Sequence, residues 1–351
     1  MKTTIQIQAG AAGQMGFLAG ESVDLVVTSP PYPMIEMWDA VFAAQDPDIA
    51  AWLERGEGQR AFEAMHRLLD EVWAELFRAL KPGGLACINI GDATRTLQGE
   101  FQLWPNHSRI AAALMRLGFA LLPDILWRKP TNAPSKFMGS GMLPAGAYVT
   151  YEHEYILIAR KGSRRVFASA AEKERRRESA YFWEERNLWF SDLWSDLKGV
   201  SQELEAEEAR RRSGAFPFEL AHRLICMFSL RGDLVLDPFL GTGTTLLAAA
   251  AAGRNAVGVE LDPACCQVAR QGLAGAVALA NNTNRARLRR HLDFVAERGR
   301  AGKPLKHFNQ PHAFPVVTAQ EEALWLDELR RAEEGDAGFF SLDYAGRPLQ
   351  P

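Results

Sequence analysis

Short apolar runs that stop at turn-forming residues alternate along the chain with longer stretches in which apolar residues recur at helical spacing. Short runs rich in valine, isoleucine and leucine are typical of buried strands, and the longer stretches are typical of helices. We therefore expect strands at residues 4–8, 23–27, 85–90, 120–127, 154–159, 234–236 and 255–262, and helices at 62–80, 108–117, 216–228, 246–252 and 263–272. This alternation predicts an α/β fold.

The run at residues 23–27 ends in a turn that contains Ser29, Pro30, Pro31 and Tyr32. Because proline lacks an amide hydrogen and fixes φ, the chain must leave the sheet here in a set direction. Open α/β sheets bind ligands at the carboxyl ends of their strands. The Ser29 hydroxyl and the Pro30 carbonyl could accept hydrogens from an exocyclic amine of a nucleobase, on which Tyr32 could stack. A plain turn after a strand is the alternative.

A second loop follows the run at residues 234–236, where Gly241 and Gly243 open a turn into a helix. Glycines allow a ligand to approach the backbone closely at a helix start. The loop lacks the lysine of a phosphate-binding P-loop, and Leu246 occupies the third glycine position of a dinucleotide fingerprint. The next strand ends in Glu260 and Asp262, the placement expected of a carboxylate that binds a ribose diol. These features favour a nucleotide-like ligand without a triphosphate.

Together, the two loops resemble those of DNA amino-methyltransferases that use S-adenosylmethionine. The resemblance extends from residue 22 to about residue 273, and the catalytic loop precedes the cofactor loop, as in the β group of that family. It implies a Rossmann-like sheet, mostly parallel with one antiparallel strand and circularly permuted. It also assigns cofactor contacts to Asp237, Pro238, Phe239, Gly241, Gly243, Thr244, Thr245, Glu260, Asp262, Phe216 and Pro217. Relatives commonly carry an acid after the glycine near residue 10, whereas this chain has Ala11, so Asp262 could supply part of the adenine contact.

We expect four regions: a catalytic half (1–160), an inserted target-recognition module (161–214), a cofactor-binding half (215–280) and a helical C-terminal extension (281–351). The insert interleaves cations with aromatic residues, as contact with DNA requires. Its aromatic residues are Phe167, Tyr181, Phe182, Trp183, Trp189, Phe190 and Trp194. Candidate DNA contacts, including two from the polar loop 128–147, are Lys129, Lys136, Arg164, Arg165, Arg175, Arg176, Trp183 and Arg186. In the extension, a capping-box pattern at Thr318 and Glu321 predicts a helix to about residue 331.

Composition sets further bounds. The 351 residues exceed the usual size of one domain, and 47% are hydrophobic, which is ample for a core. A net charge of −3 requires any surface for nucleic acid to be a local basic patch. The four cysteines show no metal-ligand spacing and predict reduced thiols, as in the cytoplasm. With no signal-peptide pattern and no apolar run of about 18 residues, neither secretion nor membrane insertion is expected.

The resemblance implies that the protein flips a base out of double-stranded DNA and methylates its exocyclic amine. Serine at the first position of the catalytic loop resembles enzymes that modify the 4-amino group of cytosine, and the 6-amino group of adenine is the alternative. The polar cluster from Asn89 to Asp92 would line the base pocket. A homodimer and a companion restriction endonuclease are compatible with the family. Rival hypotheses are a catalytically inactive DNA-binding specificity protein, a methyltransferase of RNA or protein glutamine, and a small-molecule methyltransferase.

Overall fold

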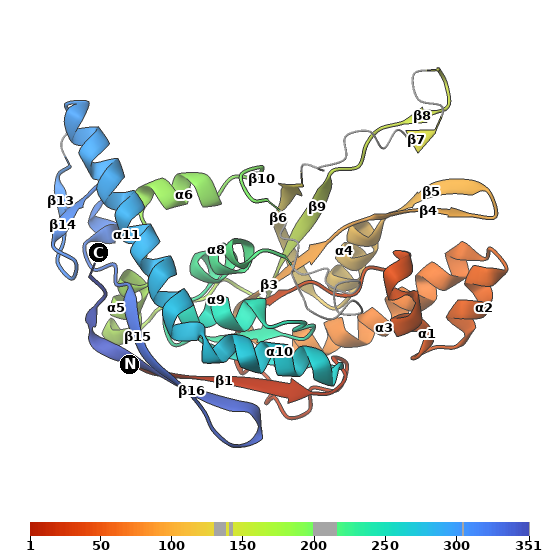
Figure 1. Cartoon of the computed structure of the whole chain (residues 1–351), viewed down its shortest axis with the longest axis horizontal. Coiled ribbons are helices and arrows are strands. Elements are labelled where there is room, and N and C mark those ends of the chain that lie inside the picture. The colour runs from red at the N-terminus through yellow and green to blue at the C-terminus, as the bar shows by residue number, and fades with distance from the viewer. Residues whose placement is uncertain (130–137, 140–142, 199–215, 304, 351) are drawn as a thin grey trace.

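A ten-stranded mixed sheet forms the centre of the molecule in the computed structural model, which describes residues 1–129, 138–139, 143–198, 216–303 and 305–350 (Figure 1). The strands follow one another across the sheet in the order β10 (Leu193–Trp194), β6 (Phe119–Arg128), β9 (His153–Lys161), β3 (Leu80–Ile90), β2 (Val23–Thr28), β11 (Leu234–Asp237), β12 (Asn255–Glu260), β1 (Lys2–Ala9), β16 (Phe339–Pro348) and β15 (Asp327–Glu334).

The five strands β3, β2, β11, β12 and β1 are mutually parallel, so their carboxyl ends share one edge of the sheet. β9 runs antiparallel between β3 and β6, so the sheet contains an antiparallel strand, as the family resemblance implied. A second antiparallel strand, β16, pairs with β1 and was not predicted. The expected α/β sheet is therefore confirmed, and it extends further than expected at the β1 side.

Helices cover both faces of the sheet. One face packs against α8 (Phe218–Phe228), α9 (Thr244–Ala252), α10 (Pro263–Ala274) and α11 (Ala276–Arg300). The other face packs against α3 (Gly58–Ala79) and α4 (Asn106–Arg116). The strands alternate accordingly, since Leu25 and Val27 enter the first core and Val26 enters the second. None of the helices in the described ranges combines the length and the apolar character that crossing a bilayer requires.

The remaining elements are short and lie outside this framework. They are η1 (Glu36–Trp38), α1 (Asp39–Ala43), α2 (Asp48–Glu54), the β4 (Ala93–Leu97) and β5 (Glu100–Trp104) hairpin, the β7 (Met138–Gly139) and β8 (Ala147–Tyr148) pair, the β13 (His307–Asn309) and β14 (Phe314–Val316) pair, η2 (Ala319–Glu321) and η3 (Asp336–Gly338). Figure 1 shows the β4–β5 and β7–β8 hairpins projecting from the main body.

The C-terminal extension is only partly helical, so the prediction of a helix at residues 318–331 is wrong. The capping box does form, because Glu321 Oε2 accepts hydrogen bonds from the Thr318 amide and hydroxyl at 2.8 Å. Only the single 3-10 turn η2 follows it, because Leu324 and Leu326 pack in a small core with Phe182 and Leu288. The chain then becomes β15 and pairs with β16. A local capping signal was overridden by tertiary burial.

The inserted segment packs tightly on the rest of the molecule as far as it is described, through residue 198. It contains α5 (Ala170–Glu178), α6 (Trp183–Trp189) and β10. Trp189 and Trp194 are 2% and 1% exposed within the main core, and Phe182 is fully buried beside the C-terminal extension. The expectation that these three aromatic residues face DNA is therefore wrong, because their rings complete the hydrophobic core.

Candidate active site

The two predicted loops begin side by side. β2 and β11 are adjacent parallel strands in which Leu25 pairs with Val235 and Val26 with Leu236, so both strands end at the same edge. Beyond this pairing, the hydroxyl of Thr28, the last residue of β2, donates to Oδ1 of Asp237, the last residue of β11, at 2.7 Å. The structure thus brings the proline-rich loop next to the glycine-rich loop at the carboxyl ends of the strands.

Asp237 anchors this junction. Its Oδ2 accepts a hydrogen bond from the Thr245 hydroxyl at 2.6 Å, and its Oδ1 accepts one from the Phe239 amide at 3.1 Å in addition to that from Thr28. Burial raises the pKa of Asp237 from its ordinary value of 3.8 to about 6, although the hydrogen bonds from Thr245 and Thr28 oppose the rise. The carboxyl group therefore ties both ends of the glycine-rich loop to the end of β2.

The glycine-rich loop leaves room for a ligand where the sequence predicted it. Gly241 has a φ of +55°, and a Cβ added there would meet no atom within 4 Å. Gly243 has a φ of +90°, and its hypothetical Cβ would lie 2.8 Å from Ala269 Cβ, so glycine is required for the loop to pack against α10. Thr244 and Thr245 then begin α9, and Pro238 is buried beneath the loop.

Glu260 closes the other side of this space at the end of β12. Its Oε2 accepts the Gly241 amide at 2.7 Å and its Oε1 accepts the Asp262 amide at 2.8 Å, while burial raises its pKa. A carboxylate held beside an open glycine is the acceptor that a ribose diol would need, so these residues fit the adenosine part of S-adenosylmethionine. Asp262 caps α10 by accepting the Ala264 amide at 2.8 Å.

Two other predicted cofactor positions, Phe216 and Pro217, lie at the start of α8. Pro217 is the N-cap of α8, preceded by Phe216, which is 7% exposed. The connection from α8 leads into the start of β11, so α8 runs against the strands and begins toward their carboxyl edge. Gly10 follows β1 at the same edge and donates its amide to the Glu260 carbonyl at 2.9 Å. As Ala11 offers no carboxylate, the side chain of Asp262 remains the predicted partner for adenine.

The hydroxyl groups of the proline-rich loop form a hydrogen-bonded chain. Ser29 Oγ donates to the Tyr32 hydroxyl at 3.1 Å, and Tyr32 donates to Glu154 Oε2 at 2.9 Å. Asn89 Nδ2 donates to both the Tyr32 hydroxyl, at 2.8 Å, and Glu154 Oε2, at 2.7 Å. Lys129 Nζ completes the set by donating to Glu154 Oε1 at 2.5 Å. These residues come from the ends of β2, β3, β6 and β9.

Tyr32 is held as a neutral phenol. Its side chain is 8% exposed, and burial together with the negative charge of Glu154 raises its pKa well above the usual value. Gly91 makes room for the ring, because a Cβ there would lie 3.0 Å from Tyr32 Cε2. Stacking of Tyr32 on a base stays a prediction. In this conformation only the small exposed part of the ring could contact a base.

The path of the loop is fixed behind Tyr32. Asn106 at the start of α4 donates to the Pro33 carbonyl and to the Gly91 carbonyl, both at 3.0 Å. His66 bonds the Asn106 carbonyl oxygen at 3.0 Å, and burial lowers the pKa of His66 to about 3, so its ring is neutral. The turns after β2 and β3 are thereby joined. The sequence predicted that prolines set the direction of the chain here, without showing which residue holds the turn in place.

The predicted pocket cluster from Asn89 to Asp92 divides between two faces. Asn89 faces Tyr32 as described, with its Oδ1 buried and without a hydrogen-bond partner among the described residues. Asp92 instead bonds His107, whose Nδ1 lies 2.7 Å from Asp92 Oδ2. The His107 ring stacks on Tyr155 with ring centroids 3.8 Å apart. Asn89 and Gly91 therefore adjoin the proline-rich loop, whereas the Asp92 carboxylate is bonded to His107.

The predicted DNA contacts are scattered. Lys129 lies in the site itself, bonded to Glu154. Arg165 and Arg175 both pair with Asp233, with N–O distances of 2.5 and 3.5 Å, at the amino end of β11 and thus at the edge opposite Ser29. Arg164 and Arg176 are exposed near them, with Arg176 over the Phe167 ring. On α6, Trp183 stacks on Phe294 and Arg186 lies over Phe190, and Lys136 falls outside the described residues.

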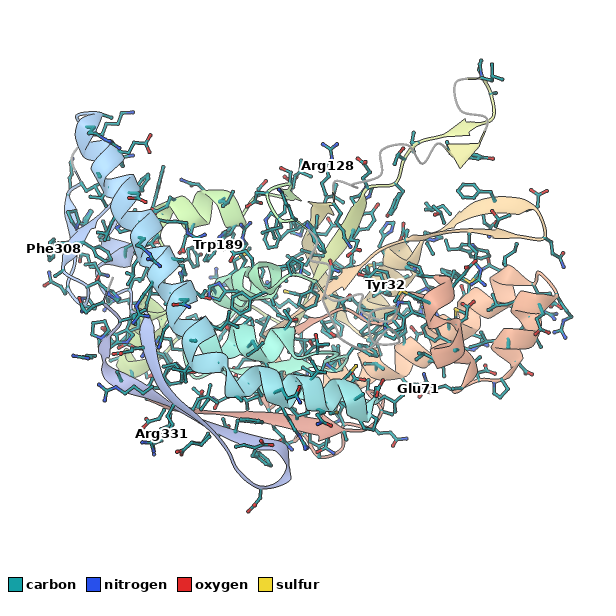
Figure 2. All side chains as sticks on the ribbon, in the orientation of Figure 1. Tyr32, Glu71, Arg128, Trp189, Phe308 and Arg331 are labelled. Carbon is teal, nitrogen blue, oxygen red and sulfur yellow. The ribbon has the colours of Figure 1, made fainter. Side chains whose placement is uncertain are left out.

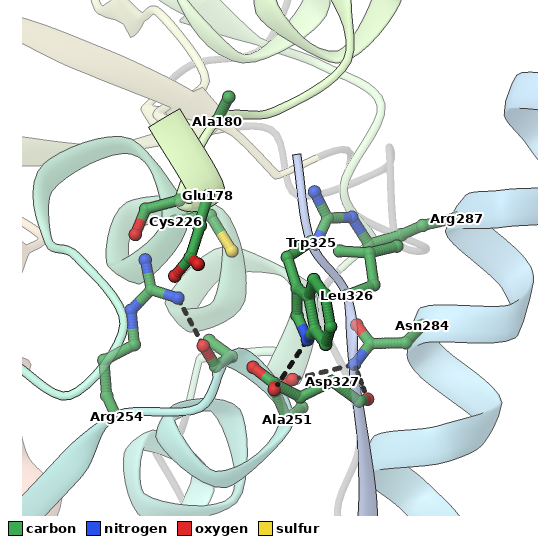
Figure 3. A pocket seen from close by; sticks show the side chains of 12 residues that line it. Glu178, Ala180, Cys226, Ala251, Arg254, Asn284, Arg287, Trp325, Leu326 and Asp327 are labelled. Atoms are coloured by element: carbon green, nitrogen blue, oxygen red, sulfur yellow. Dashed lines mark hydrogen bonds between the residues drawn. The ribbon is translucent and has the colours of Figure 1, made fainter. Parts of the chain in front are cut away.

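A cavity at the opposite edge of the sheet does not coincide with the site. It lies between α11 and the segment before β15 (Figure 3), and its volume of about 10 Å³ suits a single water molecule. Asn284, Trp325 and Asp327 line it, and Asn284 Oδ1 is buried there without a partner among the described residues. We therefore assign it a structural role.

Two residues of the site escaped the sequence analysis. Glu154 is the second residue of β9, and a carboxylate just before an apolar run was the available signal. Asn106 carries no signal beyond its position at a helix start. Lys129 was expected to contact phosphate, and its bond to Glu154 could not be foreseen because the two residues meet only across paired strands.

Comparison with known proteins gives a consistent result. A family model for DNA methylases matches residues 23–271. The type II methyltransferase M.MthZI of Methanothermobacter thermautotrophicus is 49% identical over 93% of this chain and 91% of its own length, and M.MjaI of Methanocaldococcus jannaschii is 48% identical over 74% and 88%. A putative DNA modification methylase from Thermus thermophilus, complexed with S-adenosylmethionine, superposes with a TM-score of 0.61 and 34% identity over 78% of this chain and 94% of that one.

Proposed function

Because the chain belongs to the N4/N6 family of DNA methylases, we propose that it transfers a methyl group from S-adenosylmethionine to the exocyclic 4-amino group of cytosine in double-stranded DNA. Membership makes the protein a DNA amino-methyltransferase that uses S-adenosylmethionine. The target base, the roles of single residues and the use of base flipping are our proposal.

The observation that carries the proposal is the hydrogen bond between Thr28 and Asp237. It joins Thr28, the residue before Ser29, to Asp237, the residue at which the glycine-rich loop begins. A group transfer between two bound molecules requires that their reacting atoms be held together, and alignment supplies a large share of such a rate enhancement. The proximity of the two loops supports the proposal on this point.

The bound cofactor supplies an electrophilic methyl group on a positively charged sulfur. Ser29 Oγ and the Pro30 carbonyl accept hydrogen bonds from the amine of the extruded base, which orients the nitrogen lone pair away from the ring plane. Pro30 and Pro31 fix these acceptors because the proline rings restrict the backbone. Tyr32 bounds the base pocket beside them. After the methyl group has left the sulfur for the nitrogen, the amine passes one proton to water, so no strong base is required before transfer.

Cytosine is the proposed target because a serine at the first position of the loop resembles the loop of enzymes that modify the 4-amino group. The 6-amino group of adenine is the alternative, since the same two acceptors suit either amine. Both amines lie within the duplex stack, so the base must be flipped out in either case.

DNA is the proposed macromolecular partner, and the relatives' name of type II methyltransferase supports a role in restriction and modification. We therefore propose a companion restriction endonuclease of the same site specificity, action in the cytoplasm and, from the family resemblance, a homodimer. The DNA-facing surface that we propose lies around the carboxyl ends of the strands, near Arg128 and the hairpins that project there (Figure 2).

The test is digestion of DNA to nucleosides after incubation with the protein and S-adenosylmethionine, followed by mass spectrometry. We expect N4-methyldeoxycytidine from the wild-type protein and a strongly reduced yield from Ser29→Ala with cofactor affinity retained. N6-methyldeoxyadenosine alone would overturn the choice of base. Normal turnover by both Ser29→Ala and Tyr32→Ala would remove these residues from the site.

A further inference from the structure

Glu154 stands at the end of the hydrogen-bonded chain that begins at Ser29, 125 positions earlier in the sequence. Its side chain is 12% exposed and its carboxylate receives three donors: Lys129 on Oε1, and Tyr32 and Asn89 on Oε2. An ionised carboxylate can only accept hydrogen bonds. The contact between Tyr32 and Glu154 therefore uses the single hydrogen of the phenol.

This fixes the direction of the next bond in the chain. Since the Tyr32 hydrogen is engaged by Glu154, the 3.1 Å contact between Tyr32 and Ser29 requires Ser29 to be the donor. Asn89 supplies the second hydrogen bond that the phenol oxygen accepts, so the hydroxyl of Tyr32 is fully used. The hydrogen of Ser29 is then turned toward Tyr32, and its oxygen has both lone pairs left to face the base pocket.

We propose that Glu154 is a positioning residue that acts through Tyr32 to commit the Ser29 oxygen to accepting hydrogen bonds, and so makes the site select a base with an amine over one with a carbonyl at the same position. This inference rests on the proposed role of Ser29 in binding the target amine. A hydroxyl that is free to rotate can donate to a carbonyl as readily as it accepts from an amine. With its hydrogen occupied, Ser29 presents only an acceptor, which a carbonyl oxygen would repel.

The surroundings make the arrangement durable. Tyr32 has little freedom to turn its hydroxyl elsewhere, because Gly91 and the core enclose its ring. Lys129 holds Glu154 and also lies over the Trp127 ring at 4.7 Å from its centroid. The carboxylate thus keeps both a charged partner and a fixed position without the base being present.

The experiment is a double-mutant cycle on Ser29 and Glu154. Glu154→Gln preserves the shape of the side chain, but its amide can turn to donate a hydrogen bond to Tyr32. The Tyr32 hydroxyl could then donate to Ser29, which would free the Ser29 hydrogen to point toward the base. We expect kcat on duplex DNA to fall by on the order of tenfold to a hundredfold, as for loss of a hydrogen bond to a charged group, with KM for S-adenosylmethionine unchanged. In a Ser29→Ala background the same substitution should lower kcat by less than about twofold, because the two residues act as a unit.

A second readout addresses selectivity. A duplex in which the target base is replaced by its keto analogue, uracil for cytosine or hypoxanthine for adenine, serves as a competitive inhibitor. For each protein we compare the affinity for the normal duplex with the affinity for the keto duplex. We expect this ratio to be larger for the wild-type protein than for Glu154→Gln. Equal discrimination by both proteins contradicts the proposal.

Asp24→Asn is the matched control. Asp24 is also a buried carboxylate beside a strand end, paired with Lys81 at 2.8 Å, but it lies at the opposite end of β2 from Ser29. It should reduce stability as Glu154→Gln does and leave kcat unchanged. Additive effects of Ser29→Ala and Glu154→Gln on kcat would overturn the role of Glu154 but not the proposed function. Absence of amine methylation by the wild-type protein would instead overturn the proposed function.

Discussion

The Thr28 hydroxyl and the Asp237 carboxylate, 209 positions apart in the sequence, share a buried hydrogen bond of 2.7 Å at the point where β2 and β11 end. Through this bond the proline-rich loop and the glycine-rich loop become one unit. Their relative position is therefore set by the sheet and by one polar contact, and does not depend on the segments that lead from one loop to the other.

Replacing Thr28 by valine keeps the shape of the side chain but removes this bond. We expect a loss of about 1–3 kcal/mol in the free energy of unfolding, because a buried carboxylate loses a donor, and a several-fold rise in KM for S-adenosylmethionine. Thr3→Val is the control, since Thr3 is equally buried in β1 and bonds Tyr344 at 3.3 Å. It should lower stability without changing KM. Unchanged KM in Thr28→Val would show that the contact does not shape the cofactor site.

The raised pKa of Asp237 predicts a pH dependence of stability. Because its folded-state pKa is about 6 and its ordinary value is 3.8, the folded protein holds more protons than the unfolded chain between these values. The free energy of unfolding contributed by this group therefore falls as pH rises from about 4 to 6, by about 3 kcal/mol in total. Denaturant unfolding across this range should show that Asp237→Asn lacks this fall. Parallel pH profiles for the two proteins would contradict the assignment.

Gly91→Ala should disturb Tyr32 and the neighbouring Glu154. The added Cβ would lie 3.0 Å from Tyr32 Cε2 and 3.3 Å from Glu154 Cγ, so the ring must shift by a few tenths of an ångström. Positioning groups tolerate little displacement, and we expect kcat to fall by roughly tenfold with cofactor affinity retained. Gly16→Ala, where a Cβ meets no atom within 4 Å, should be without effect in the same turnover assay.

The exposed cations at the two edges of the sheet should differ in their effect on DNA binding. Arg128 ends β6 at the same edge as the site, and its side chain is 60% exposed. Arg128→Ala should weaken binding at all sequences and reduce the salt slope by about one. Arg176→Ala, on α5 beside the Asp233 cluster, should leave affinity unchanged in the same salt titration. The opposite result would place the DNA on the other edge of the sheet.

The sequence predicted most of what local patterns determine. Residues 23–27 and 234–236 were recognisable as buried strands, and both loops follow them because proline and glycine restrict or free the backbone in identifiable ways. The meeting of the loops followed from the rule that parallel strands present their carboxyl ends together. The fold class and the meeting of the two loops were therefore predictable from the sequence.

Contacts between distant segments were not predictable. Glu154 reaches Tyr32 over 122 positions, and nothing near Glu154 in the sequence indicates that partner. Trp189 and Trp194 were expected to face DNA because cations surround them, but their large apolar area stabilises the core when buried. At Thr318 the capping signal was correct, but the long helix that it predicted does not form. Pairing with β16 stabilises residues 327–334 as a strand instead.

The central claim is that the ends of β2 and β11 form one site in which the cofactor faces Ser29. The most direct measurement is a crystal structure of the protein with S-adenosylmethionine bound. Our account predicts the ribose hydroxyls within hydrogen-bond distance of the Glu260 carboxylate and the sulfonium methyl directed toward the space in front of Ser29 Oγ. A cofactor bound elsewhere, or one whose methyl group points away from Ser29, would contradict it.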